Sequence, residues 1–306
     1  YRKLGVEYIP LDLNDPSGIG ALPTDFDFVA HLAGRLPANS DFDLSTEDDA
    51  AEYIRTNALG TALLLEWARK NGVRRIVSTT SYADVQNRWS ASEPVREDWP
   101  RNFRLDGDHA AYVISKNASA DLLFYYNEQY GMRNCVFRLP PVYGCGPHGS
   151  LRVNGAVKKS GIGLFVDKAK MGVGITVFGD ADAAVRDIVY VKDVAQAFVK
   201  AGKSESASGL YNIGSGRAVS LREQAEAIAE VFSGAAGTSE VCVDETRPNG
   251  IQPYSFDISR AVCDFGYAPA FADFRDLMAD WKVEEERGVM PALFDATLKP
   301  SGGLLD

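Results

Sequence analysis

Short apolar runs alternate with longer stretches of helical periodicity along the first 140 residues. Between residues 50 and 68, apolar side chains recur three or four positions apart, the period of an amphipathic helix. Residues 108–130 repeat this pattern and end at Gly131, where a helix commonly stops. Apolar runs that predict strands occupy residues 6–11, 27–33, 75–80 and 134–139. This alternation predicts an α/β fold of Rossmann-like type, with a doubly wound parallel sheet.

The pattern changes after residue 140 and predicts a second, smaller α/β domain that is interleaved with the first. Residues 140–173 are rich in glycine and carry no clear period. Beyond them, strands are predicted at 175–178 and 210–213, a strand followed by a helix over 188–201, and helices at 221–232 and 271–286. We therefore assign residues 1–140 and 180–214 to the first domain and residues 141–179 and 215–300 to the second.

The glycine-rich turn that opens a dinucleotide-binding fold has no counterpart in this sequence. Such a turn joins the first strand to a helix whose N-terminus takes a pyrophosphate. Gly18 and Gly20 follow the first predicted strand, but Pro23 occupies the place of the third glycine, so we interpret this segment as a loop. The chain thus begins before the third strand of such a fold, and we expect the first βα unit to be absent from it.

Composition and charge narrow the class of protein. Hydrophobic residues make up 45% of the chain and charged residues 24%, as in ordinary globular proteins. A net charge of −10 argues against a general binder of nucleic acid, and no run of about 18 apolar residues predicts a membrane span. The spacing of the cysteines and the three histidines predicts no metal site and favours a reduced, cytoplasmic protein. The cysteines are Cys135, Cys145, Cys242 and Cys263.

The sharpest chemical signal is the pair Tyr112 and Lys116 on a predicted helix. A spacing of four places both side chains on one helical face, about 5–6 Å apart at Cβ. An ammonium group stabilises a phenolate, so we expect Lys116 to lower the pKa of Tyr112 from its usual value of about 10. Such a phenol suits proton transfer at a hydroxyl group while hydride leaves the adjacent carbon.

A second signal is the hydroxyl-rich end of the strand at 75–80. Thr79, Thr80 and Ser81 close this strand about thirty residues before Tyr112. The carboxyl ends of parallel strands border the cleft in which ligands of doubly wound sheets bind. We therefore expect these hydroxyl groups to point into that cleft.

With these motifs, the sequence resembles the extended short-chain dehydrogenases/reductases, the NAD-dependent epimerase/dehydratase family of sugar-nucleotide enzymes. The resemblance runs from about Val6 to Pro269, with the motifs in the family's order. They are Asp12-Leu13, His31 to Gly34, Asn57 to Thr61, Ser81, Tyr112 with Lys116, Arg138 to Gly144, Phe178 to Asp180, Arg186-Asp187, Tyr190 to Asp193, Tyr211 to Gly216, Arg247-Pro248 and Asp257 to Ala261. The resemblance implies that the first domain binds NAD, with NADP as the alternative, and that the second binds substrate.

The resemblance also implies roles for single residues. Catalysis would use Tyr112, Lys116 and Ser81. The residues implied to bind the cofactor are Asp12, Leu13, Leu32, Ala33, Gly34, Asn57, Thr79, Tyr112, Lys116 and Pro140. Those implied to bind the substrate are Ser81, Tyr82, Pro141, Arg186 and Arg247, of which the two arginines would clamp a diphosphate. Family members often form homodimers through the helices at 50–68 and 108–130, and we expect the same here.

Some positions depart from the family pattern. Pro141 stands where many members carry a substrate-contacting Asn, and Gly250 stands where 4-epimerases often carry an Asp. Tyr82 and Ala83 replace the Asp-Glu pair with which 4,6-dehydratases eliminate water, so dehydration is disfavoured.

The favoured hypothesis is an NAD-dependent epimerase that oxidises a nucleotide-activated sugar transiently to a 4-keto intermediate. An NAD(P)H-dependent keto-sugar or aldehyde reductase is the first alternative, because Tyr112, Lys116 and Ser81 serve both reactions. A non-catalytic dinucleotide sensor is the second alternative, since fold does not determine function.

Overall fold

The computed structural model describes residues 5–37, 50–107, 109–146, 150–153, 156–234 and 237–288. Its centre is a four-stranded parallel sheet in the order β1-β2-β3-β10. The strands are β1 (Val29–His31), β2 (Ile76–Ser81), β3 (Cys135–Leu139) and β10 (Gly209–Asn212). Val77 of β2 lies in register with Ala30 on one side and Cys135 on the other. The predicted Rossmann-like parallel sheet is confirmed.

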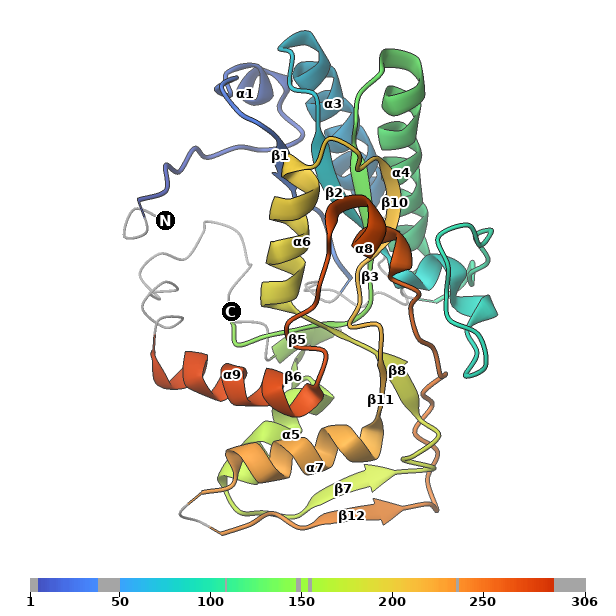
Figure 1. Ribbon diagram of the computed structural model, residues 1–306, viewed down its shortest axis with the longest axis vertical. Coiled ribbons are helices and arrows are strands. Elements are labelled where there is room, and N and C mark those ends of the chain that lie inside the picture. Colours follow the sequence, from blue (N-terminus) through green and yellow to red (C-terminus); the bar gives the residue numbers. More distant parts are fainter. Residues whose placement is uncertain are drawn as a thin grey trace.

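Helices cover both faces of this sheet, as Figure 1 shows. Ile76 of β2 packs in one hydrophobic cluster with Leu65 and Leu123. Its neighbour Val77 points to the opposite face and packs with Phe198, because successive strand residues alternate sides. The helices of the first face are α2 (Ala50–Tyr53), the π-helix η2 (Ile54–Leu59), α3 (Gly60–Lys70) and α4 (Ala110–Tyr130). Those of the second face are α6 (Val191–Lys203) and α8 (Ser259–Phe265).

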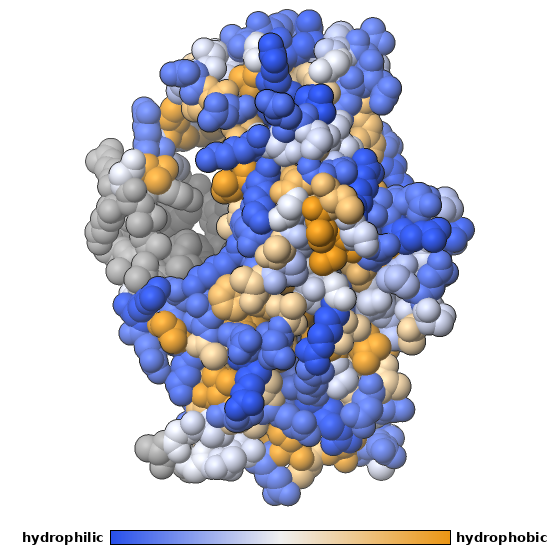
Figure 2. Space-filling model, viewed as in Figure 1, coloured by the Kyte–Doolittle hydropathy of each residue, from blue (hydrophilic) through white to orange (hydrophobic). Residues whose placement is uncertain are grey.

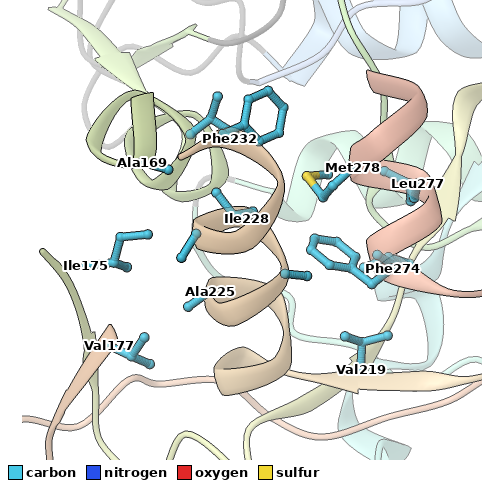
Figure 3. Packing of buried hydrophobic residues seen from close by; sticks show 14 of the residues in the cluster. Ala169, Ile175, Val177, Val219, Ala225, Ile228, Phe232, Phe274, Leu277 and Met278 are labelled. Atoms are coloured by element: carbon cyan, nitrogen blue, oxygen red, sulfur yellow. The ribbon is translucent and has the colours of Figure 1, made fainter. Parts of the chain in front are cut away.

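A second group of elements surrounds α7 (Leu221–Phe232). Figure 3 shows Ala225, Ile228 and Phe232 of this helix between β7 and α9, in a cluster that excludes water. β7 pairs in parallel with β12, and β8 pairs antiparallel with β11. The bounds are α5 (Gly161–Lys170), β7 (Ile175–Phe178), β8 (Val185–Asp187), β11 (Ala218–Ser220), β12 (Val241–Asp244) and α9 (Phe274–Glu286).

Shorter elements complete the fold. Helix α1 (Pro16–Gly20) packs against α3 of the first group. β4 and β9 pair in parallel, and β5 and β6 form an antiparallel pair. The bounds are η3 (Tyr82–Arg88), a 3-10 helix, β4 (Val142–Tyr143), β5 (Ser150–Val153), β6 (Ala156–Lys159) and β9 (Val189–Tyr190). In the described parts of the chain, no helix is long and apolar enough to cross a bilayer. Hydrophobic residues on the face in Figure 2 lie in patches separated by hydrophilic ones.

Two predicted segments differ from the structure. Residues 6–11 form no strand, and Tyr8 is 62% exposed, because an apolar run becomes a strand only where a neighbouring strand accepts its hydrogen bonds. Gly18 and Gly20 belong to helix α1 rather than to a loop: Asp15 accepts a hydrogen bond from the backbone N–H of Ser17, and Pro16 begins the helix. The predicted domain boundaries stay a prediction, and the end of the second range, beyond residue 288, lies outside the described residues.

A buried arginine joins β2 to the end of α6. The side chain of Arg75 is 6% exposed and has hydrogen bonds to carbonyl groups only. A cation at the C-terminus of a helix satisfies carbonyls that the helix itself leaves unpaired. The acceptors are the carbonyl oxygens of Arg133, Ala201, Gly202, Ser204 and Ala207.

Replacement of Arg75 by Met should therefore lower the free energy of unfolding by about 3 kcal/mol, since several buried carbonyls lose their donor. Urea denaturation followed by circular dichroism measures this loss. The exposed neighbour Arg74 is the matched control, and Arg74→Met should change stability by no more than about 0.5 kcal/mol. Equal effects of the two substitutions would contradict this role of Arg75.

Candidate active site

The end of β2 and the first turns of α4 bring the three predicted catalytic residues together. Ser81 is the last residue of β2, is 8% exposed and accepts a hydrogen bond from the backbone N–H of Ala83 at 3.2 Å. Helix α4 packs against β2 and carries Tyr112 and Lys116 one turn apart. The side chain of Lys116 reaches β2 itself, where Nζ lies 3.5 Å from Oγ1 of Thr79.

Lys116 is a buried ammonium group without a carboxylate partner among the described residues. Its one hydrogen bond there, to Thr79, is long, while an ammonium group has three donors. Burial lowers the pKa of Lys116 to about 8, because a charge is costly away from water. The remaining donors suit a ligand that brings hydroxyl oxygens, such as a ribose.

Burial raises the pKa of Tyr112 to about 12, and neighbouring Tyr82 adds to this shift. Our expectation that Lys116 lowers this pKa is therefore wrong for the protein alone. Desolvation disfavours the phenolate, and no hydrogen bond joins the two side chains in the described structure to offset it. Tyr112 consequently holds its proton at neutral pH and is poised as a proton donor.

The backbone after β1 is exposed to solvent, and the side chain of Asn57 holds it in place through hydrogen bonds. Leu32, Ala33 and Gly34 are exposed. Oδ1 of Asn57 accepts a hydrogen bond from the backbone N–H of Arg35 at 2.7 Å, and Nδ2 donates to the carbonyl of Arg35 at 3.1 Å. A Cβ atom at residue 34 would lie only 3.0 Å from Oδ1 of Asn57, which accounts for the glycine.

Asn57 also binds the catalytic helix. Its Nδ2 donates a hydrogen bond to Oγ of Ser115, next to Lys116, at 2.8 Å. Asn57 lies in the π-helix η2, a form that occurs most often at functional sites. Both hydrogens of its amide are used within the protein, so Asn57 would position the residues around a cofactor rather than donate to it.

These features fit a nicotinamide dinucleotide. The backbone at Gly34 is exposed and lies close to Asn57. Lys116 has N–H donors that no described residue accepts, and these could bind the hydroxyl groups of a ribose. Other predicted cofactor residues lie at the edge of this region: Asp12 is exposed and accepts hydrogen bonds from Asn14, Leu13 is buried against Gly60, and Pro140 is buried after β3. Their roles remain predictions.

Arg186 and Tyr82 lie on the substrate side. Nη2 of Arg186 donates a hydrogen bond to the hydroxyl of Tyr143 at 3.0 Å, and its Nε has no partner in the described structure. Burial raises the pKa of Tyr82, and the charge of Arg186 partly opposes this, so the two side chains are neighbours. Pro141 is half-buried, and its carbonyl accepts a hydrogen bond from Val189.

Arg247 contacts Phe178 at the end of β7. Its guanidinium group lies over the ring of Phe178, 5.1 Å from the centroid, and the side chain is exposed. No contact of Arg247 with Arg186 occurs in the described structure. A joint diphosphate clamp therefore stays a prediction.

Several residues of this region had no predicted role. Asp84, three residues after Ser81, forms a buried ion pair with Arg138, with Oδ1 and Nε 2.9 Å apart. Trp89 and Tyr254 contact the ring of Tyr82. Trp89 could have been suspected from the sequence because it is an aromatic residue close to Ser81. No local spacing links residue 254 to residue 82. In the ranges that the structure describes, no three His, Cys, Asp or Glu side chains gather as a metal site.

Comparison with known proteins places these features in a family. The family model described as NAD dependent epimerase/dehydratase family matches residues 2–214. A UDP-glucose 4-epimerase of Mycolicibacterium smegmatis is 31% identical over 272 residues, 87% of this chain and 79% of that protein. A GDP-6-deoxy-D-mannose reductase of Pseudomonas aeruginosa is 28% identical over 289 residues, 90% of this chain and 88% of that protein.

A solved structure shares the fold and contains a cofactor. The UDP-glucose 4-epimerase of Thermus thermophilus in complex with NAD is 25% identical, with a TM-score of 0.65. The match covers 90% of this chain and 84% of that one.

His31 lies beneath this region in a chain of hydroxyl groups. The Thr61 hydroxyl donates to the carbonyl of Asn57 at 2.6 Å, so Nε2 of His31, 3.0 Å from the same oxygen, is the donor to it. Ser119 adds a third contact at 3.0 Å. Burial, assisted by the charge of Lys116, lowers the pKa of His31 to about 4.

Because the folded-state pKa lies below the ordinary value of 6.5, the stability contributed by neutral His31 is present above pH 6.5 and lost as the pH falls through 4. Lowering the pH from 6.5 to 4 should therefore reduce the free energy of unfolding of wild type by about 2–3 kcal/mol more than that of His31→Gln. Urea denaturation at half-unit pH steps measures it. The same substitution at exposed His109 is the control; parallel curves for both variants would contradict the assignment.

Proposed function

Since the chain belongs to the NAD-dependent epimerase/dehydratase family, we propose that this enzyme is an NAD-dependent epimerase of a nucleotide-activated sugar. The observation that carries the proposal is that Lys116 of α4 reaches Thr79 of β2, the strand that Ser81 ends, while Tyr112 lies one turn from Lys116 on the same helix. Dehydration is disfavoured, since Ala83 offers no acid or base and the carboxylate of Asp84 is engaged by Arg138.

NAD would be held by the open strand end at Gly34 and by Lys116, and it supplies the chemistry of taking up and returning hydride. Tyr112 would take up the proton of the sugar C4 hydroxyl as a phenolate, which the ammonium group of Lys116 would have to stabilise against desolvation, and it would return that proton when hydride comes back. Ser81 hydrogen-bonds the oxygen at the same carbon and holds it in place. Arg186, which has an unpartnered Nε in the described structure, binds the diphosphate.

A keto-sugar reductase is the second candidate, and the state of Tyr112 favours it. A phenol with a pKa of about 12 donates a proton to a carbonyl more readily than it takes one from an alcohol. The similarity to the reductase of Pseudomonas aeruginosa, over most of both chains, supports the same reading.

We also propose a cytoplasmic homodimer with the predicted division into domains. All four cysteines are free thiols, as is usual in a reducing compartment. Helices α3 and α4 pack side by side, and Ile114 and Tyr125 on α4 are 42% and 50% exposed. A second copy would cover these side chains. Residues 1–140 and 180–214 would bind NAD, and residues 141–179 and 215–300 the substrate.

The cofactor content of the purified protein tests the main proposal. Denaturation should release nearly stoichiometric NAD, and incubation with UDP-, dTDP- and GDP-hexoses should produce a 4-epimer from at least one of them without net formation of NADH. Absorbance at 340 nm and chromatography of the products measure both. Consumption of NADPH with a carbonyl substrate and no epimer would reject the epimerase and favour the reductase. Bound dinucleotide without turnover of any substrate would leave a dinucleotide sensor.

Replacement of Tyr112 by Phe should lower kcat by about 10²–10⁴-fold, because it removes the group that transfers the proton. The NAD content of the protein should stay unchanged. Tyr125→Phe, on an exposed position of the same helix, is the control and should leave kcat within about twofold of wild type. A Tyr112→Phe enzyme with wild-type kcat would exclude Tyr112 as the acid/base.

A further inference from the structure

Three aromatic rings form one surface beside the catalytic residues. The rings of Tyr82 and Trp89 are stacked, with centroids 5.1 Å apart and planes 4° from parallel. Tyr254 contacts both, at 5.5 Å from Tyr82 and 4.6 Å from Trp89. We call Tyr82, Trp89 and Tyr254 the aromatic wall. Tyr254 lies behind, 3% exposed, while Tyr82 and Trp89 are half-buried and keep ring surface available.

The aromatic wall is held rigidly, although its members come from distant parts of the chain. Tyr82 and Trp89 flank the ends of η3, and Nε2 of Gln252 donates hydrogen bonds to the carbonyl of Trp89 and to that of Gln86. The N–H of Tyr254 donates to the carbonyl of Val185 at 3.2 Å. Val85, Val95 and Phe256 pack behind the rings.

The aromatic wall adjoins both the catalytic residues and Arg186, which is proposed to bind the diphosphate. Tyr82 directly follows Ser81, and its phenol acts on Tyr112. Tyr254 pairs through its backbone with Arg186, whose charge also acts on Tyr82. In a nucleotide sugar the diphosphate is attached to C1 and the reacting carbon C4 lies across the ring. A sugar bound by both groups would therefore lie against this wall.

We propose that the aromatic wall packs against the sugar ring of the substrate and selects sugars with an uncharged C5 substituent over uronic acids. The proposal rests on the proposed function and adds the substrate class to it. The C–H faces of a pyranose are apolar and pack well on flat aromatic rings, which bury a large area and lose little entropy.

A carboxylate at C5 would lose hydration at this wall without gaining a partner. The charges that act on the rings are Arg186 and, on Tyr254, also the buried Asp187. Arg186 serves the diphosphate, and Asp187 repels a second anion. Further polar neighbours are the phenols of Tyr112 and Tyr143, which burial keeps neutral, the indole N–H of Trp89 and the amide of Gln252; none of these groups carries a positive charge. Burial of an unpaired charge is unfavourable, so the wall discriminates against the carboxylate.

Calorimetric titration of the purified protein tests this. Titrations with UDP, dTDP and GDP identify the preferred nucleotide, and its glucosyl and glucuronosyl esters are then compared. Wild type should bind the glucosyl ester at least tenfold more tightly than the glucuronosyl ester. In Tyr82→Ala this ratio should fall below threefold while the affinity for the free nucleotide stays unchanged. Tyr82→Phe keeps the ring and should keep the ratio.

Equal binding of the two esters by wild type, an unchanged ratio in Tyr82→Ala, or no binding of any nucleotide sugar would overturn the proposal. If Tyr82→Ala does not fold, Tyr82→Leu retains apolar volume without the flat ring and carries the same test. An assay for 4-epimers in parallel separates the two hypotheses. Selective binding without epimerisation would reject the proposed function alone, and equally fast epimerisation of both esters would reject the wall alone.

Discussion

The geometry of the site depends on one buried carboxylate, that of Asp187. Its oxygens accept hydrogen bonds from the N–H and hydroxyl of Ser215, at 2.9 and 2.8 Å, and from the N–H of Phe256 at 3.1 Å. Burial raises its pKa to about 6 against the effect of these bonds. The carboxylate thereby joins three segments far apart in sequence and sets the backbone of its neighbour Arg186 and of Tyr254. Without it, the backbone bridge between Arg186 and Tyr254 would lose the support of these side-chain hydrogen bonds.

The parallel sheet could be predicted from the sequence because its strands are short apolar runs between amphipathic helices. Residues 75–80 and 134–139 are buried on both faces, and such strands keep their pattern wherever they pair. Residues 6–11 show the limit of this reasoning. Their composition favours a strand, but a strand forms only where a neighbouring strand offers hydrogen-bond partners, and the local sequence does not reveal that neighbour. Helix α1 was missed because its start depends on a cap by Asp15, while two glycines disfavour a helix.

The arrangement of the candidate site was predictable where its residues share one element. The spacing of Tyr112 and Lys116 predicted one helical face, and both lie on α4 one turn apart. The catalytic roles of these residues and of Ser81 stay predictions. The pKa of Tyr112 was not predictable, because desolvation depends on every atom around the phenol and here outweighs the nearby ammonium group. Tyr254 could not be placed beside Tyr82 either, since 172 residues separate them and only the folded second domain brings them together.

The π-helix has a consequence for how this region tolerates insertions and deletions. A π-turn contains one residue more than an α-turn, so η2 absorbs an extra residue between α2 and α3. Deletion of one residue within η2 would restore a continuous α-helix, keep α2 and α3 in phase, and change the direction of the side chains inside η2. Asn57 could then no longer face both Arg35 and Ser115. A single-codon change would thus uncouple the cofactor strand from the catalytic helix while leaving the sheet itself intact.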